Sequence, residues 1–167
     1  MITGYPYEES IRVPLVVMDP RMKKSDRNRR HDEFTLNIDL APTILEAANI
    51  PVPAVMQGHN FAPLYLNSDK DKANESWRKE FYYEWFTGET LTGTTDLIPS
   101  SLALVRKDTK YIIWPDYNYE ELFRLRPDPF EEKNIYNASL QTSKALLDEV
   151  KARFKELQSA AKDGFKL

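Results

Sequence analysis

The 167-residue sequence contains no cysteine, which excludes disulfide bonds and thiolate metal ligands. Its two histidines, His31 and His59, lack a second ligand at the spacing of a zinc motif. No apolar run approaches the ~20 residues of a membrane-spanning helix, and the sequence shows no signal peptide. The net charge of −3 argues against a surface dedicated to nucleic acid. We therefore expect no metal site, no membrane partner and no nucleic-acid partner.

The residues that are present suffice for a packed protein. Hydrophobic side chains make up 41% of the sequence and aromatic side chains 12%, so we do not expect extensive disorder. Residues 67–76 are polar and almost devoid of large apolar side chains, which indicates an exposed loop. We expect this loop to separate two subdomains, at residues 1–66 and 77–167.

The first subdomain opens with an apolar segment that runs from Ile11 to Met18. After Pro14 this segment is apolar at both alternating positions, a pattern typical of a strand inside a sheet covered on both faces. Too little chain precedes the segment to supply the rest of such a sheet. The pattern therefore predicts the carboxy-terminal part of a larger α/β protein.

A helix over residues 40–49 is predicted next. Asp39 stands where an N-cap is expected, and Pro42 falls in the first turn, where its missing N–H does no harm. Asn49, just before Ile50 and Pro51, is a stop signal.

The second subdomain alternates short apolar runs with turns. Strands are predicted at residues 80–86, 102–106, 110–114 and 121–125, with a hairpin loop between the second and third. Residues 139–161 predict a helix with Ser139 as its N-cap, because apolar residues recur at helical spacing. This stripe consists of Leu147, Val150, Phe154, Leu157 and Ala161. The expected fold class is α/β (α+β), ending in a small antiparallel sheet packed against a long carboxy-terminal helix.

Ordered blocks of this sequence resemble the sulfatases of the alkaline-phosphatase-like superfamily. They include Tyr-Glu-Glu-Ser-Ile-Arg-Val-Pro-Leu at 7–15, Asn-Ile-Asp-Leu-Ala-Pro-Thr-Ile-Leu at 37–45, Lys-Tyr-Ile at 110–112 and Asp-Pro-Phe-Glu-Glu-Lys-Asn at 128–134. The resemblance covers most of the chain and preserves the order of the family's blocks. It implies the end of an α/β sulfatase core, followed by the sulfatase carboxy-terminal subdomain.

The residues that carry catalysis in that family do not appear in this sequence. The resemblance implies a formylglycine nucleophile, made from a Cys/Ser-x-Pro/Ala-x-Arg motif, and a calcium ion held by upstream Asp, Asn and His residues. The sequence contains no such motif, and residues 3–6 lack the lysine that often precedes the first block. We therefore assign no catalytic residue and no cofactor to this chain. Calcium and formylglycine are expected only in a complete family member, which would be periplasmic or secreted.

Five residues are candidates for binding a sulfated sugar. Arg12, Arg106 and Lys107 could meet the sulfate group, and Tyr82 and Trp85 could stack on the sugar ring. Each has a structural alternative: Arg12 could pair with a neighbouring glutamate, and the aromatic rings could pack in the core. Residues 21–30 hold six basic side chains, which form either a solvated loop or a surface for a polyanionic glycan.

Two functions from different classes follow. The first is the carboxy-terminal portion of a sulfatase, a sulfuric ester hydrolase acting on a sulfated carbohydrate, which is inactive without its catalytic half. The second is a truncated, non-catalytic module that binds a glycan or a partner. A phosphate- or phosphonate-ester hydrolase on the same fold is a further interpretation. We also expect the apolar strand at residues 11–18 to pair with a second copy and form a homodimer.

Overall fold

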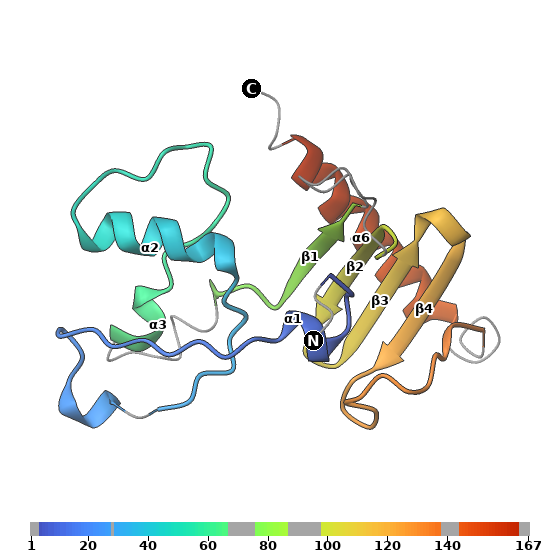
Figure 1. Ribbon diagram of the computed structural model, residues 1–167, viewed down its shortest axis with the longest axis horizontal. Helices are drawn as coiled ribbons and strands as arrows, with labels where there is room; N and C mark the ends of the chain where they lie inside the picture. The colour runs from blue at the N-terminus through green and yellow to red at the C-terminus, as the bar shows by residue number, and fades with distance from the viewer. Residues whose placement is uncertain (1–3, 28, 67–75, 87–97, 138–143, 164–167) are drawn as a thin grey trace. The chain divides into compact units, whose positions relative to one another are not determined.

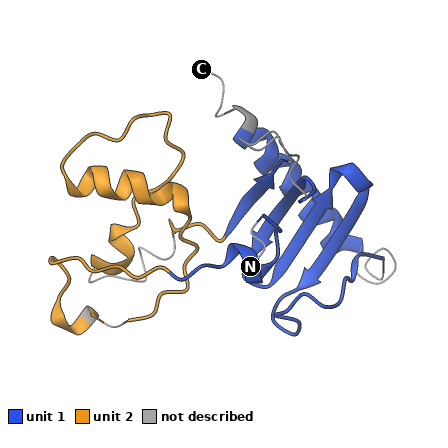
Figure 2. Ribbon diagram, viewed as in Figure 1, with its two compact units in different colours: residues 1–14, 80–163 blue, residues 15–79, 164–167 orange. Residues whose placement is uncertain are grey.

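The computed structural model describes residues 4–27, 29–66, 76–86, 98–137 and 144–163, which form two compact units (Figures 1 and 2). Unit 1 combines Met1–Pro14 with Glu80–Asp163, and unit 2 is built from Leu15–Lys79. None of the described helices is long and apolar enough to cross a membrane.

Unit 1 is built on a four-stranded antiparallel sheet in the order β1-β2-β3-β4 (Figure 1). The strands are β1 Glu80–Trp85, β2 Ser101–Arg106, β3 Thr109–Trp114 and β4 Tyr119–Arg124. The hairpin predicted between the second and third strands is confirmed, because Val105 pairs with Lys110 across the Lys107–Asp108 turn. A short 3-10 helix, η3 Pro115–Tyr117, leads from β3 into β4.

The long helix α6, Lys144–Asp163, packs on one face of the sheet. Its apolar stripe meets the large side chains that β2, β3 and β4 present to that face. The buried cluster consists of Leu102, Leu104, Tyr111, Leu122, Leu147, Val150 and Phe154. The predicted packing of helix against sheet is therefore confirmed, whereas Ser139, the predicted N-cap, lies outside the described residues.

The amino-terminal segment of the chain covers the opposite face of the sheet. The ring of Tyr7 lies 6.2 Å from the rings of both Trp114 and Phe123, measured between centroids, and Pro6 is fully buried. One helical turn, α1 Glu8–Ile11, follows. The strand predicted from Ile11 to Met18 is wrong: its first residue closes this turn, and residues 12–18 are not in a strand.

Unit 2 contains short helices around a small apolar core. Its helices are η1 Lys24–Asp26, η2 Asn37–Asp39, α2 Leu40–Ala47 and α3 Ala62–Leu66. The core is made of Phe61, Ala62, Leu64 and Tyr65. The predicted stop after α2 is confirmed, since Asn49 adopts a left-handed φ of 55° and the Ile50 N–H donates back to the Leu45 carbonyl at 2.9 Å.

Replacement of Val150 by Asp tests the contact between α6 and the sheet. Val150 is completely buried, so Val150→Asp places an unpaired carboxylate in an apolar core and should cost about 3 kcal/mol or more. Ala152→Asp, on the exposed side of the same helix, is the matched control and should change little. Urea unfolding followed by circular dichroism measures both, and equal stabilities would show that the stripe is not buried.

Candidate functional site

The fully buried Lys110 of β3 is the centre of a charged cluster in unit 1. Its Nζ atom lies 2.9 Å from Glu8 Oε1 and 2.8 Å from Glu131 Oε1, and it donates to the Pro6 carbonyl at 2.9 Å. The two carboxylates are ion-pair partners of the ammonium group, and the Pro6 carbonyl accepts one of its hydrogens. We call Lys110, Glu8 and Glu131 the lysine centre.

Glu131 joins the lysine centre to the amino-terminal segment. Its Oε2 atom accepts the backbone N–H of Glu8 at 2.6 Å, although 123 positions separate the two residues. Burial raises the pKa of the Glu131 carboxyl group, and the ion pair with Lys110 only partly offsets this effect. Glu131 itself has a left-handed φ of 56°, which turns the loop after β4 toward the sheet.

The other polar residues of the Asp-Pro-x-Glu-x-x-Asn block shape the same loop. Asp128 accepts the backbone N–H groups of the two residues after Glu131, both at 3.0 Å. Asn134 Oδ1 accepts the N–H of Leu122 at 3.0 Å and that of Tyr136 at 2.9 Å. The block therefore holds the loop against β4 and presents Glu131 to Lys110.

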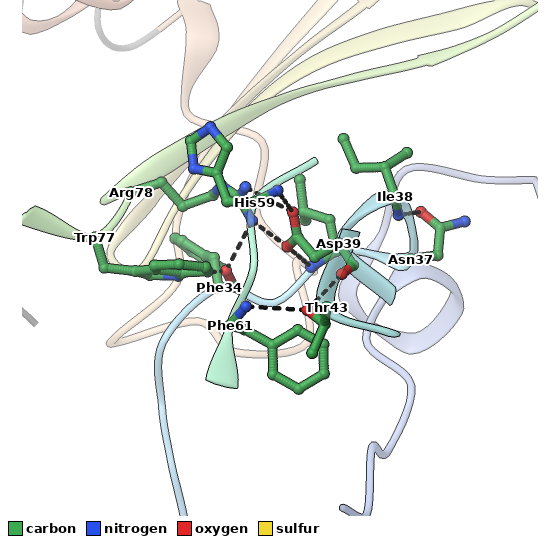
Figure 3. Close-up of polar contacts among 10 residues, drawn as sticks. Phe34, Asn37, Ile38, Asp39, Thr43, His59, Phe61, Trp77 and Arg78 are labelled. Atoms are coloured by element: carbon green, nitrogen blue, oxygen red, sulfur yellow. Dashed lines mark hydrogen bonds and ion pairs between the residues drawn. The ribbon is translucent and has the colours of Figure 1, made fainter. Parts of the chain in front are cut away.

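A second buried carboxylate, Asp39, organises unit 2 (Figure 3). Its Oδ1 atom accepts the His59 N–H at 2.7 Å and Arg78 Nη2 at 2.8 Å. Its Oδ2 atom accepts the Leu36 N–H at 2.7 Å and also pairs with Arg78 Nη1. We call Asp39 and Arg78, with these N–H donors, the aspartate centre.

The surroundings of the aspartate centre explain how it is held. Thr43 Oγ1 donates to the Asp39 carbonyl at 2.7 Å and accepts the Phe61 N–H at 3.0 Å (Figure 3). Gly58 packs directly on the backbone of η2, and this close approach brings the His59 N–H to Asp39. A Cβ atom at Gly58 would lie 1.9 Å from the Ile38 carbonyl oxygen, so no other residue fits without movement of the backbone.

Burial alone would raise the pKa of Asp39, but the Arg78 guanidinium and the N–H groups of His59 and Leu36 outweigh burial and lower it. Asp39 is the N-cap residue of α2, as predicted, but its side chain makes no cap bond to that helix and accepts the Leu36 N–H at the start of η2 instead. His59 contributes its backbone N–H, while its ring packs edge-on against Trp77. We found no sequence signal for the pairing of Asp39 with Arg78.

The structure places Tyr82 and Arg106 on the α6 face of the sheet. The Tyr82 ring packs against Phe154 at 5.5 Å between centroids, and burial raises its pKa to about 12. Arg106 is held by two carboxylates, Glu80 and Glu149, with its closest contact to each at 2.7 Å. Both side chains therefore have internal partners.

The other three predicted sugar-binding residues lie elsewhere in unit 1. Trp85 is an odd number of positions from Tyr82 on β1 and so faces the opposite side of the sheet, near Gly4. Its indole N–H is buried and has no partner among the described residues. Arg12 and Lys107 are exposed. The structure thus brings Tyr82 and Arg106 to one face and does not gather all five.

The described residues contain no group of three or more His, Asp or Glu side chains that could hold a metal ion. They therefore do not fit the calcium site expected of a complete sulfatase. A shallow hollow of about 240 Å³ in unit 2 is lined in part by Arg21, Glu46 and Asn60. Arg21 is bound to Asp19, and Asn60 donates to Glu46 at 2.5 Å, so these polar groups already have partners.

A family model described as N-sulphoglucosamine sulphohydrolase, C-terminal, matches residues 4–160. This chain belongs to the sulfatase family. The predicted resemblance and fold class are confirmed, and this sulfatase chain is the carboxy-terminal region, related to glycosaminoglycan sulfatases.

Two curated relatives come from Bacteroides thetaiotaomicron. Its N-acetylglucosamine-6-O-sulfatase is 27% identical over 158 residues, which cover 91% of this chain and 27% of the relative. Its Delta 4,5-hexuronate-2-O-sulfatase is 29% identical over 160 residues, which cover 90% of this chain and 30% of the relative. This sulfatase chain therefore spans less than a third of the length of these relatives.

A solved structure of a protein in complex with its substrate, D-glucosamine-2-N,6-O-disulfate, is also similar. It aligns with a TM-score of 0.61 at 25% identity, covering 79% of this chain and 26% of that chain. The similarity to these proteins runs through both units of this sulfatase chain and not only through the sheet.

The lysine centre should be essential to the stability of unit 1. Lys110→Met leaves two carboxylates facing each other without a cation and should cost about 3–5 kcal/mol of unfolding free energy. Adding Glu131→Gln should recover part of that loss, because it removes one uncompensated charge. Urea unfolding measures both variants, with the exposed Lys107→Met as a control expected to behave like the unchanged protein.

The aspartate centre should make stability depend on acid pH. The lowered pKa of Asp39 contributes stability that is complete above its ordinary pKa of 3.8 and is lost as pH falls through the lower folded-state value. Asp39→Asn should cost about 3–5 kcal/mol at pH 7, because Arg78 then lacks its counter-ion. The difference in unfolding free energy between the unchanged protein and Asp39→Asn should become smaller as unfolding is measured at successively lower pH. A difference that stays constant with pH would contradict the lowered pKa of Asp39.

Proposed function

We propose that this chain is the carboxy-terminal portion of a sulfatase that hydrolyses sulfate groups on a sulfated carbohydrate. The observation that carries the proposal is the family match over residues 4–160, made to the carboxy-terminal region of N-sulphoglucosamine sulphohydrolase. Relatives named for sulfated amino sugars and hexuronates support the choice of substrate class.

The proposal gives this chain a structural role and not the chemical step. The sequence contains no cysteine and no Ser-x-Pro/Ala-x-Arg motif from which a formylglycine could be made. Its two buried charged centres are occupied by internal ion pairs, so neither leaves a carboxylate or a cation free to meet a substrate. Without an activated nucleophile such as a formylglycine, these residues cannot attack a sulfate ester.

We propose that the contacts of this chain with the substrate are made by the residues predicted from the sequence. Arg12 and Lys107 are exposed and can meet a sulfate group directly. Trp85 is partly buried, and Tyr82 and Arg106 would first have to leave Phe154 and two carboxylates. We therefore rank Arg12 and Lys107 ahead of Arg106 as sulfate ligands.

A hydrolysis assay tests the proposed function. This chain alone, with calcium, should give no turnover of aryl sulfates or D-glucosamine-2-N,6-O-disulfate above buffer, because it lacks a nucleophile. The complete protein encoded by the same reading frame should release sulfate from the sugar and leave a matched phosphate ester intact.

Two results would contradict the proposal. Turnover that tracks with the purified chain alone would show that its own residues carry the chemistry. A complete protein that cleaves only phosphate or phosphonate esters would overturn the substrate class while leaving the family membership unchanged.

A non-catalytic partner-binding module is the second candidate function. Exposed apolar side chains on unit 2, led by Val16 and Met18, favour it, because such surfaces mark interfaces. The first candidate places catalysis in another part of the same protein, whereas the second is a module that binds a glycan or a partner and takes part in no catalysis.

A further inference from the structure

The segment from residue 21 to residue 30 is strongly basic, although the chain as a whole is acidic. It holds six arginine and lysine side chains and one aspartate, whereas the other 157 residues hold 17 basic and 25 acidic side chains. Its charge is therefore opposite in sign to that of the rest of the chain. Exposed charge of one sign attracts a mobile anion within a distance of about 8 Å at physiological ionic strength.

Four of these side chains have no ion-pair or hydrogen-bond partner among the described residues. We call them the basic loop, and all four are exposed: Lys23, Lys24, Arg27 and Arg30. Arg78 and Arg106 differ from them, because carboxylates occupy both of those guanidinium groups. The N–H donors of the basic loop are therefore open to an external anion, and no internal contact has to be given up for binding.

The 3-10 turn η1, drawn as a short blue helix of unit 2 in Figure 1, gives two of these cations a common direction. It runs from Lys24 to Asp26, and Arg27 follows it directly. In a 3-10 helix, side chains three positions apart lie above one another, so Lys24 and Arg27 point to the same side. One anionic chain can therefore meet both side chains without a change in the backbone.

Both ends of the segment are attached to the rest of unit 2. Asp19, which is buried, accepts the backbone N–H of Arg21 at 2.9 Å and binds its guanidinium group. Met22 packs against the apolar core of unit 2. Beyond the segment, the Phe34 carbonyl accepts the Trp77 indole N–H at 2.8 Å. The basic loop thus belongs to a stretch of chain fixed on both sides, which reduces the conformational entropy lost when a ligand orders it.

We propose that the basic loop is a binding site for a sulfated polysaccharide. The choice of sulfate as the anion rests on the proposed function. Guanidinium and ammonium groups form charge-assisted hydrogen bonds with such oxygens, and a planar guanidinium group can bind two of them at once. One exposed ion pair binds weakly in water, so four neighbouring cations favour a polymer with repeated sulfate groups over a single sulfated sugar.

The composition of the segment argues against two other anionic partners. Residues 21–33 contain no Phe, Tyr or Trp, the side chains on which proteins stack unpaired bases. Their described side chains include no exposed large apolar group that would enter the surface of a membrane. A sulfated polysaccharide needs neither contact, because its charges and hydrogen-bond acceptors lie on the outside of the polymer. Single-stranded DNA and anionic vesicles are therefore competing outcomes of the test.

Calorimetric titration of this chain with heparin tests the site. The basic-loop variant combines four substitutions: Lys23→Gln, Lys24→Gln, Arg27→Gln and Arg30→Gln. It should bind heparin roughly tenfold more weakly or worse, because the cations are lost while polar side chains remain. Lys23→Gln with Lys24→Gln alone should give an intermediate loss. Heparin stripped of its sulfate groups should bind the unchanged chain roughly tenfold more weakly than heparin itself.

A matched control removes the same charge from unit 1. It combines substitutions of four exposed side chains in β4, the loop after it and α6: Arg124→Gln, Arg126→Gln, Lys133→Gln and Lys155→Gln. Both variants lose two arginines and two lysines, so an effect of net charge alone would be equal in the two. The control should keep the heparin affinity of the unchanged chain, and both variants should keep its Tm, because every substituted side chain is exposed.

Several results would overturn the site. They are equal heparin affinity of the unchanged chain and the basic-loop variant, equal losses in that variant and the control, and equal affinity for heparin and its desulfated form. Tighter binding of single-stranded DNA or of phosphatidylserine vesicles than of heparin would assign the basic loop to that partner and would also overturn it.

The fate of the site can be separated from that of the proposed function. If heparin binding depends on the basic loop but the complete protein from the same reading frame releases no sulfate, the site stands and the proposed function fails. If the complete protein releases sulfate but the basic-loop variant binds heparin as the unchanged chain does, the proposed function stands and the site fails.

Discussion

A lysine with no exposure to solvent is the constraint on which unit 1 depends. A buried ammonium group is tolerated only where counter-charges and acceptors surround it, because its transfer from water is costly. Lys110 is the second residue of β3, and the partners of its ammonium group come from outside the sheet. The amino-terminal segment supplies Glu8 and the Pro6 carbonyl, and the loop after β4 supplies Glu131. One cation therefore joins two segments that are 123 positions apart in the sequence.

Unit 2 also depends on a buried charge, which in this case is negative. Asp39 is a buried anion that binds Arg78 and accepts the backbone N–H groups of Leu36 and His59. Lys110, Glu8, Glu131 and Asp39 lie within blocks by which the sequence resembles sulfatases, whereas Arg78 lies outside them. Those blocks are thus explained in this chain as the matching halves of buried ion pairs.

The sequence predicted well the elements that local pattern determines. The stripe Leu147, Val150 and Phe154 predicts α6 because its spacing is that of one helical face, and Asn49 predicts a helix stop because it tolerates a left-handed φ. The lysine centre was not predictable, because residues 123 positions apart meet in it through folding alone. The N-cap position of Asp39 was predicted, but its pairing with Arg78 was not, because a short acidic residue before a helix has the same local pattern whether its side chain caps the helix or is buried with an arginine.

The failed strand at residues 11–18 is the most informative of these differences. Its apolar alternation is a genuine property of the sequence, yet a strand exists only when a neighbouring strand completes its hydrogen bonds. In the described chain the four sheet strands pair with one another in an unbroken order, and none is offered to this segment. Val17 nevertheless keeps the inward orientation that the pattern requires, while Val16 and Met18 face solvent. The side chains at these positions thus alternate as the pattern predicts, but no neighbouring strand among the described residues completes the hydrogen bonds that would make the segment a strand.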